Sequence, residues 1–140
     1  MAGRPSSASG WAKKKTEALI TIGTPFDFIN AYYPTYYTQR SKVIEDTITW
    51  LNVYSISDAL GSNYRKDGKI GDAEYGVTPE GLKPININYE VVHLESFNFF
   101  SFLMLNNLKV HGMYWNNSSD GQSCLNPIYL KLVELKLIEV

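Results

Sequence analysis

The sequence predicts an α+β fold that is mainly β: a small antiparallel sheet or sandwich with one or two short helices and a flexible basic N-terminal arm. Several apolar runs are rich in β-branched and aromatic residues and alternate with polar residues, as strands do. Clusters of Gly, Pro, Asn and Asp separate these runs, which is typical of turns. We therefore divide the 140 residues into an arm over 1–16 and a single β-rich domain over 17–140.

The arm begins with small polar residues over 1–10, which cannot bury enough surface to offset the entropy of ordering them. The first 22 residues have a net charge of +3, whereas the whole chain has −1. The basic residues are Arg4, Lys13, Lys14 and Lys15. They indicate either a solvated terminus or a contact with nucleic acid or an acidic partner.

A short strand is predicted over Ala18–Ile22, ending at Gly23. In the segment that follows, Pro25 and Pro34 disfavour a regular helix. Four tyrosines surround the second proline: Tyr32, Tyr33, Tyr36 and Tyr37. An apolar ring with a polar hydroxyl suits an interface, so we interpret them as partner-contact candidates. A loop lying over the domain's own core is the alternative.

The next predicted elements are a helix over 39–47 and a strand over 48–56, although helix and strand remain alternatives across 41–56. A glycine-rich loop is expected over 61–84, and long loops usually serve function or contacts with other chains. Its Asp67, Asp72 and Glu74 do not have the EF-hand spacing, so we expect a solvated turn. Clean alternation over 85–91 predicts another strand.

The most apolar stretch is Phe97–Trp115, which we interpret as two strands joined by a turn at Asn106 and Asn107. Both faces of this hairpin carry large apolar side chains, with Phe100, Phe102 and Trp115 on the same face. Burial of such side chains is worth roughly 1.5–3 kcal/mol each, so a second layer or a neighbouring subunit should cover them. A buried helix over 95–106 is the alternative.

A long strand is predicted over the final residues 128–140, where apolar residues lie on both faces. The alternative is a helix to about Leu135, followed by a short strand over Leu137–Val140.

The sequence lacks a glycine-rich phosphate loop, zinc-ligand spacing and a nucleophile elbow. His93 and His111, the two histidines, could face each other as metal ligands, but no second cysteine or carboxylate cluster accompanies them. The single Cys124 is interpreted as a buried inert thiol. We therefore expect no catalytic residue, no metal, no cofactor and no enzymatic activity.

The low charged fraction of 19% and the aromatic fraction of 14% favour a structural subunit of an oligomeric assembly, such as a virus or bacteriophage particle. Its expected partners are copies of itself or other subunits. One alternative is a nucleic-acid-binding or regulatory domain that uses the basic arm. Another is a carbohydrate-binding β module in which tyrosines and Trp115 stack on sugars. No apolar run is long enough to span a bilayer, so we expect no membrane, cytoplasmic synthesis and possible incorporation into a virion.

Overall fold

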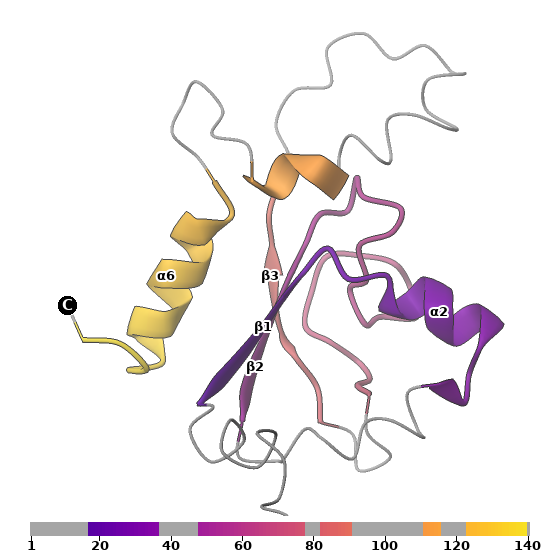
Figure 1. Ribbon diagram of the computed structural model, residues 1–140, viewed down its shortest axis with the longest axis horizontal. Coiled ribbons are helices and arrows are strands. Elements are labelled where there is room, and N and C mark those ends of the chain that lie inside the picture. Colours follow the sequence, from indigo (N-terminus) through magenta and orange to yellow (C-terminus); the bar gives the residue numbers. More distant parts are fainter. Residues whose placement is uncertain (1–16, 37–47, 78–81, 91–110, 116–122, 140) are drawn as a thin grey trace, which may run out of the picture.

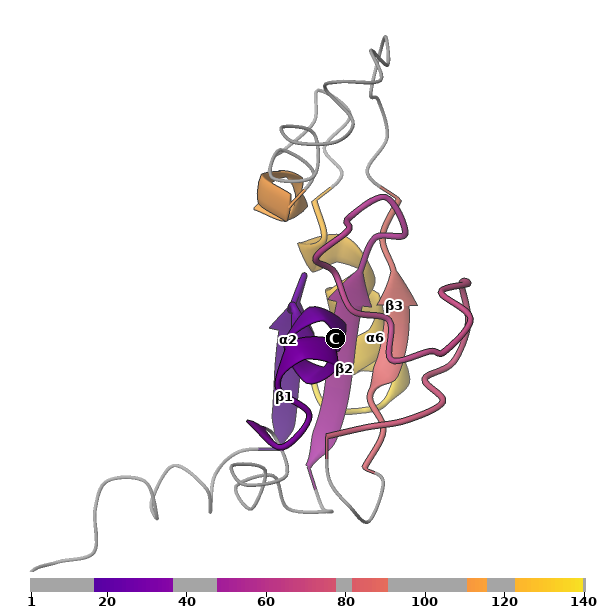
Figure 2. The same cartoon turned by 90° about the vertical axis from the view of Figure 1, so that its right-hand side faces the viewer.

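The computed structural model describes residues 17–36, 48–77, 82–90, 111–115 and 123–139. Its elements are β1 (Ala18–Ile22), α2 (Phe26–Tyr32), β2 (Thr49–Tyr54), β3 (Ile85–Asn88), the 3-10 helix η2 (Met113–Trp115) and α6 (Leu125–Glu134). The three strands form one sheet in the order β1-β2-β3, and both strand pairs are parallel. Helix α2 lies on one face of this sheet and α6 on the other (Figure 1 and Figure 2).

The prediction of an antiparallel sheet or sandwich is therefore wrong, because the described strands pair only in parallel. Parallel neighbours need a connection long enough to return the chain to the starting edge, commonly through a helix. Helix α2 lies within the connection from β1 to β2, and a long segment joins β2 to β3. Polar and apolar alternation indicates a strand but carries no information about the direction of its neighbour.

The positions of the strands themselves are confirmed. β1 has the predicted bounds, β2 lies within the predicted 48–56, and β3 lies within 85–91. The helix expected over 39–47 lies outside the described residues.

Helix α2 contradicts the expectation that Pro25 and Pro34 disfavour a regular helix in this segment. Pro25 is the N-cap residue, and Pro34 follows the C-cap residue Tyr33. Proline suits the start of a helix, where its missing N–H has no partner, and the region beyond a helix end. Ile29 N donates to Pro25 O at 2.9 Å, which closes the first turn. The two prolines thus bracket the helix.

Helix α6 also replaces a predicted strand, and the helical alternative was the correct one. It spans Leu125–Glu134, and Pro127 lies in its first turn, where no hydrogen-bond donor is required. The alternative's short strand over Leu137–Val140 is not formed in the described residues up to 139.

Most of the predicted hairpin over Phe97–Trp115 lies outside the described residues. At its C-terminal end, His111 and Gly112 are helical and run into η2, so the strand expected there is wrong. His111 and Tyr114 of this turn contact Asp58 in the loop after β2. These tertiary contacts stabilise the helical turn in place of the pairing expected for a strand.

Two apolar clusters pack on the two faces of the sheet. On the α2 side the buried residues are Phe26, Trp50, Tyr64 and Val77, and on the α6 side they are Val53, Tyr114, Cys124 and Ile128. Because both faces are covered, the central strand β2 is almost wholly buried, as is usual in parallel sheets.

A row of polar side chains crosses the α2 face of the sheet. Thr21, Asn52 and Asn86 are in register on the three strands. The Thr21 hydroxyl donates to Asn52 Oδ1 at 2.9 Å, and Asn52 Nδ2 donates to Asn86 Oδ1 at 3.1 Å. Asn52 Nδ2 also donates to Ser62 O at 2.8 Å, and Asn86 Nδ2 to Gly71 O at 2.9 Å. The row therefore ties the loop after β2 to the sheet.

Candidate functional site

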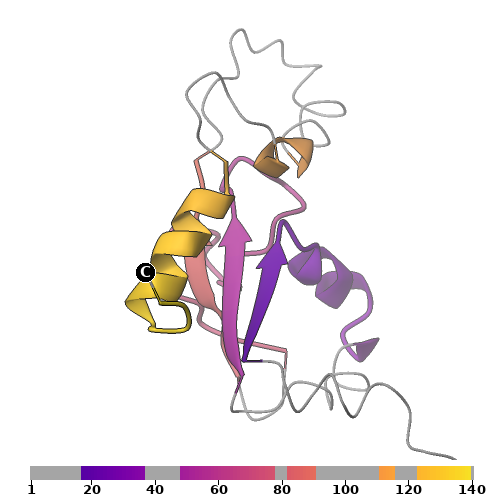
Figure 3. The ribbon, with the colours of Figure 1, turned by 60° about the vertical axis from the view of Figure 1, so that its left-hand side comes forward.

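The carboxyl ends of the three strands meet at one edge of the sheet, and the turn containing η2 lies just beyond that edge (Figure 3). Gly23 directly follows β1, and Ser55 directly follows β2. Ligand sites of open parallel sheets form at this edge, where loops from neighbouring strands converge. Residues gathered at this edge are therefore candidates for a functional site.

Asp58 lies in the loop after β2, and its side chain is 0% exposed. Its backbone is held in a tight turn, with Asp58 N donating to Ser55 O and Gly61 N donating to Asp58 O, both at 3.0 Å. Leu60 N donates to Oδ1 at 3.0 Å, which fixes one carboxylate oxygen. Removing a carboxylate from water is costly unless donors replace the water, so its other contacts matter.

His111 supplies one of those donors. Its Nδ1 lies 3.0 Å from Asp58 Oδ2, and 38% of its side chain is exposed. A hydrogen bond to a carboxylate favours the proton on Nδ1 and leaves Nε2 with its lone pair. Nε2 is on the opposite side of the ring, so the imidazole has one oriented nitrogen and one nitrogen able to accept a proton.

Tyr114 supplies the second donor to Oδ2. Its hydroxyl donates to Asp58 Oδ2 at 3.0 Å and accepts a hydrogen bond from Ser55 N at 2.9 Å. Its ring meets the His111 ring edge-on, with centroids 6.2 Å apart. Residues three apart in a helical turn lie on the same side, so the turn presents both side chains to Asp58.

Two glycines, Gly23 and Gly61, provide the space in which the side chains of Asp58, His111 and Tyr114 pack together. A Cβ on Gly23 would lie 2.7 Å from Tyr114 Cε2 and 3.1 Å from His111 Cε1. A Cβ on Gly61 would lie 3.0 Å from both the Tyr114 hydroxyl and Asp58 Oδ2. Gly23 also has φ +54, a conformation that side-chain-bearing residues rarely adopt. The end of β1 is thus shaped around the three side chains.

A half-exposed imidazole whose second nitrogen is held by a buried carboxylate is the arrangement of a general base. The carboxylate keeps the ring in one tautomer and stabilises the positive charge that the ring gains with a proton. The arrangement is therefore suited to proton transfer.

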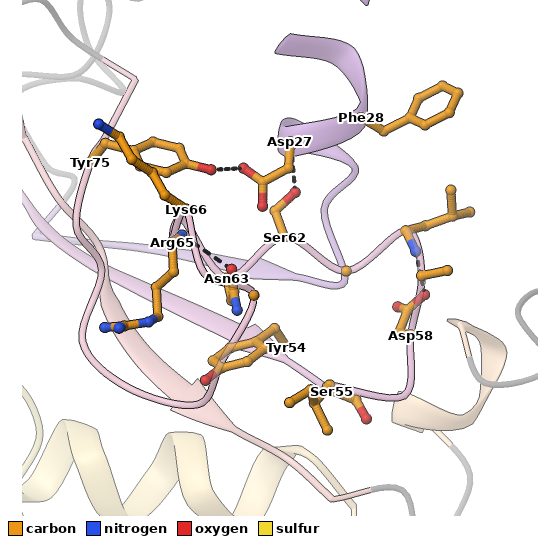
Figure 4. A pocket seen from close by; sticks show the side chains of 15 residues that line it. Asp27, Phe28, Tyr54, Ser55, Asp58, Ser62, Asn63, Arg65, Lys66 and Tyr75 are labelled. Atoms are coloured by element: carbon orange, nitrogen blue, oxygen red, sulfur yellow. Dashed lines mark hydrogen bonds between the residues drawn. The ribbon is translucent and has the colours of Figure 1, made fainter. Parts of the chain in front are cut away.

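A cavity of about 310 Å³ lies at the same edge of the sheet, on the α2 side of the loop (Figure 4). Side chains of Asp27, Ser62 and Tyr75 point toward one another at its wall. Tyr75 donates its hydroxyl proton to Asp27 Oδ1 at 2.6 Å, and Asp27 N donates to Ser62 Oγ at 2.7 Å. Burial and the nearby Asp27 carboxylate raise the pKa of Tyr75, which keeps this donor protonated.

The cavity and the His111 cluster share the turn from Ser55 to Gly61. Residues of this turn line the cavity, and its Asp58 carboxylate binds His111 and Tyr114. His111 and Tyr114 themselves do not line the cavity. The two features therefore meet at this turn, and Asp58 is the one residue of the cluster that also lines the cavity.

The acidic residues of the following loop have a structural role. Arg65 Nε lies 2.8 Å from Asp67 Oδ1, and Arg65 Nη2 lies 2.9 Å from Glu74 Oε1. Arg65 Nη1 donates to Asp72 O at 2.8 Å. The hydrogen bonds from Arg65 hold the pKa of Asp67 well below its usual range. The three acidic residues thus hold Arg65, with Asp67 and Glu74 as its ion-pair partners.

No protein-family model matches the chain. No curated protein and no solved structure matches it either. Within the described ranges, no cluster of three or more His, Cys, Asp and Glu side chains could hold a metal ion. The helices of the same ranges include none that is long and apolar enough to cross a membrane.

The structure describes some of the predicted partner-contact residues. Tyr32, Tyr33, Tyr36 and Trp115 are exposed. Tyr32 packs on Phe28 of the same helix, with centroids 4.9 Å apart. These residues do not form one site, because Trp115 is on η2 and the tyrosines belong to α2 and its C-terminal flank. Other candidates lie outside the described residues: Arg4, Lys13, Lys14, Lys15, Tyr37, Phe100, Phe102 and His93.

Asp58 is not among the candidates predicted from the sequence, whereas His111 is among them as a metal ligand. Two signals were present: a glycine directly after the first strand, and an acidic residue shortly after the second. Parallel strands would have brought both to one edge, whereas an antiparallel sheet separates them. The missing information was thus the direction of the strands.

Proposed function

We propose that this chain carries an acid–base centre for hydrolysis of an ester or amide bond, with His111 as the general base and Asp58 as its orienting carboxylate. The observation that supports this proposal most strongly is the 3.0 Å hydrogen bond from a half-exposed imidazole to a buried carboxylate. A histidine needed only for packing would not require a buried ionisable partner, which is costly to desolvate.

In the proposed reaction, His111 Nε2 takes a proton from a hydroxyl nucleophile or a water molecule. The nucleophile's oxygen attacks the carbonyl carbon, and the resulting imidazolium is stabilised by Asp58. The imidazolium then returns the proton to the leaving oxygen or nitrogen as its bond to carbon breaks. With water as nucleophile, the products are a carboxylic acid and an alcohol or amine.

The order of the two residues along the chain supports the same chemistry. A carboxylate followed by a histidine, both beyond the carboxyl edge of a parallel sheet, is the order of acid and base in α/β-hydrolases. This likeness concerns arrangement alone. The chain has no G-x-S-x-G motif, so the proposal includes water as a nucleophile.

The test is hydrolysis of p-nitrophenyl acetate by the full chain and its histidine variants. His111→Gln should lower the rate by about 10²-fold or more, the usual contribution of general-base catalysis. His93→Gln removes the other histidine and is the matched control, which should keep the wild-type rate. Equal rates for wild type and His111→Gln would refute the proposal. Labelling by a fluorophosphonate would distinguish a serine nucleophile from water.

A structural role in an assembly is the second candidate, and the exposed apolar residues support it. Phe28, Tyr32 and Tyr33 are exposed on or next to α2, and Leu125, Tyr129 and Leu130 on α6. Exposed apolar groups of this kind mark surfaces that contact other chains. Whether such a partner is a virion component stays a prediction, as do the nucleic-acid and carbohydrate alternatives.

The assembly proposal predicts a native mass above that of one chain in size-exclusion chromatography with light scattering. Replacing Tyr32 and Tyr33 with serine should reduce that mass, because both side chains are exposed and their loss leaves the core intact. Tyr129→Ser tests the α6 surface separately. A single-chain mass for the wild type at the highest attainable concentration would contradict this function.

A further inference from the structure

Tyr114 packs its ring in the core and also contacts the proposed site through its hydroxyl. Its hydroxyl donates to Asp58 Oδ2, the same oxygen that faces His111 Nδ1, and both distances are 3.0 Å. We infer that Tyr114 is a positioning residue that holds the Asp58 carboxylate in the orientation His111 needs, an inference that rests on the proposed function.

The direction of the Tyr114 hydrogen bond is determined by its surroundings. A phenol has one proton to donate, and its oxygen already accepts from the Ser55 amide at 2.9 Å. The proton must therefore point to the carboxylate. Burial and the nearby Asp58 raise the pKa of Tyr114, so the hydroxyl keeps its proton at neutral and mildly alkaline pH.

The ring of Tyr114 is held firmly enough to position another group. It is buried in the cluster with Val53, Cys124 and Ile128, and 1% of the residue is exposed. Gly61 approaches the hydroxyl from one side and Gly23 approaches the ring from another. A hydroxyl on a fixed ring restricts rotation of the carboxylate, which on its Oδ1 side is held by Leu60 N.

Without the hydroxyl, Oδ2 keeps one donor instead of two, and the carboxylate can rotate away from Nδ1. The imidazole would then populate the tautomer with its proton on Nε2. In that tautomer Nε2 has no free lone pair and cannot take a proton from the nucleophile. A positioning residue should therefore alter kcat and the tautomer of His111, and should not alter substrate affinity.

The first measurement is ester hydrolysis by Tyr114→Phe, which keeps the ring and removes the hydroxyl. We expect kcat to fall by roughly tenfold, the effect of one hydrogen bond to a charged group, with KM within about twofold of the wild type. Tyr129→Phe, on the exposed side of α6, is the matched control and should keep the wild-type kcat. Circular dichroism and the melting temperature establish that each variant is folded.

The second measurement needs no turnover: ¹⁵N NMR of the histidine side chains in the full chain. In the wild type, neutral His111 should carry its proton on Nδ1, and in Tyr114→Phe the Nε2–H tautomer should increase. Unchanged kcat and tautomer in Tyr114→Phe, alongside a large loss in His111→Gln, would overturn the inference and leave the proposed function standing. Equal hydrolysis by wild type and His111→Gln would refute the proposed function, and the tautomer measurement would still decide whether Tyr114 positions the ring.

Discussion

Asn52→Ala is expected to lower the free energy of unfolding by about 3–5 kcal/mol, measured by urea denaturation. Asn52 is 0% exposed at the centre of the sheet, and its amide connects both neighbouring strands to the loop after β2. Alanine leaves a cavity and removes the partner of the Ser62 carbonyl and of Asn86 Oδ1. Each buried polar atom left without a partner costs about 1–3 kcal/mol.

Asn52→Leu separates the effect of the lost hydrogen bonds on stability from the effect of the lost side-chain volume, because leucine fills a similar space without polar atoms. We expect it to remain at least about 2 kcal/mol less stable than the wild type, since the Ser62 carbonyl still lacks its donor. A leucine variant as stable as the wild type would show that the polar row contributes nothing to folding.

Gly23→Ala is expected to destabilise the chain by about 2–4 kcal/mol and to abolish His111-dependent hydrolysis. Its φ of +54 costs a side-chain-bearing residue about 1–2 kcal/mol. The added Cβ would also lie 2.7 Å from Tyr114 Cε2, so that the Tyr114 and His111 rings must move. Overpacking of this kind typically costs about 1–3 kcal/mol.

Gly68→Ala is the matched control for the conformational cost of placing a side chain at a positive φ. Gly68 has a similar φ of +64, but a Cβ there would meet nothing within 4 Å. It should show only the conformational cost of about 1–2 kcal/mol and should keep the wild-type rate of hydrolysis. If both glycine variants lose the same stability and the same activity, Gly23 does not leave room for the site.

The two proposed functions make different demands on the molecule. Catalysis requires the Asp58, His111 and Tyr114 contacts at the carboxyl edge of the sheet, whereas assembly depends on exposed aromatic residues of α2 and α6. The two sets share no residue, so the hydrolysis and mass measurements test the two proposals separately. Both functions can hold in one chain.

Local sequence was sufficient to locate the three strands, because β-branched residues and a period of two favour extended backbone wherever they occur. Local sequence signals gave wrong predictions for both helices, α2 and α6. The residues of α6 alternate well enough for a strand, and Pro25 looked like a helix breaker although it is the N-cap of α2. In both cases, packing against a face of the sheet decided the conformation.

The direction of the strands and the composition of the site depended on the tertiary structure. Asp58 and His111 are 53 residues apart in sequence, and no local pattern indicates that they meet. Their contact follows from a parallel sheet, which brings the ends of β1 and β2 to one edge. It also follows from the helical turn just beyond that edge, whose Tyr114 packs against Val53. Such a pairing is set by burial and connection geometry over the whole chain, which short-range periodicity does not encode.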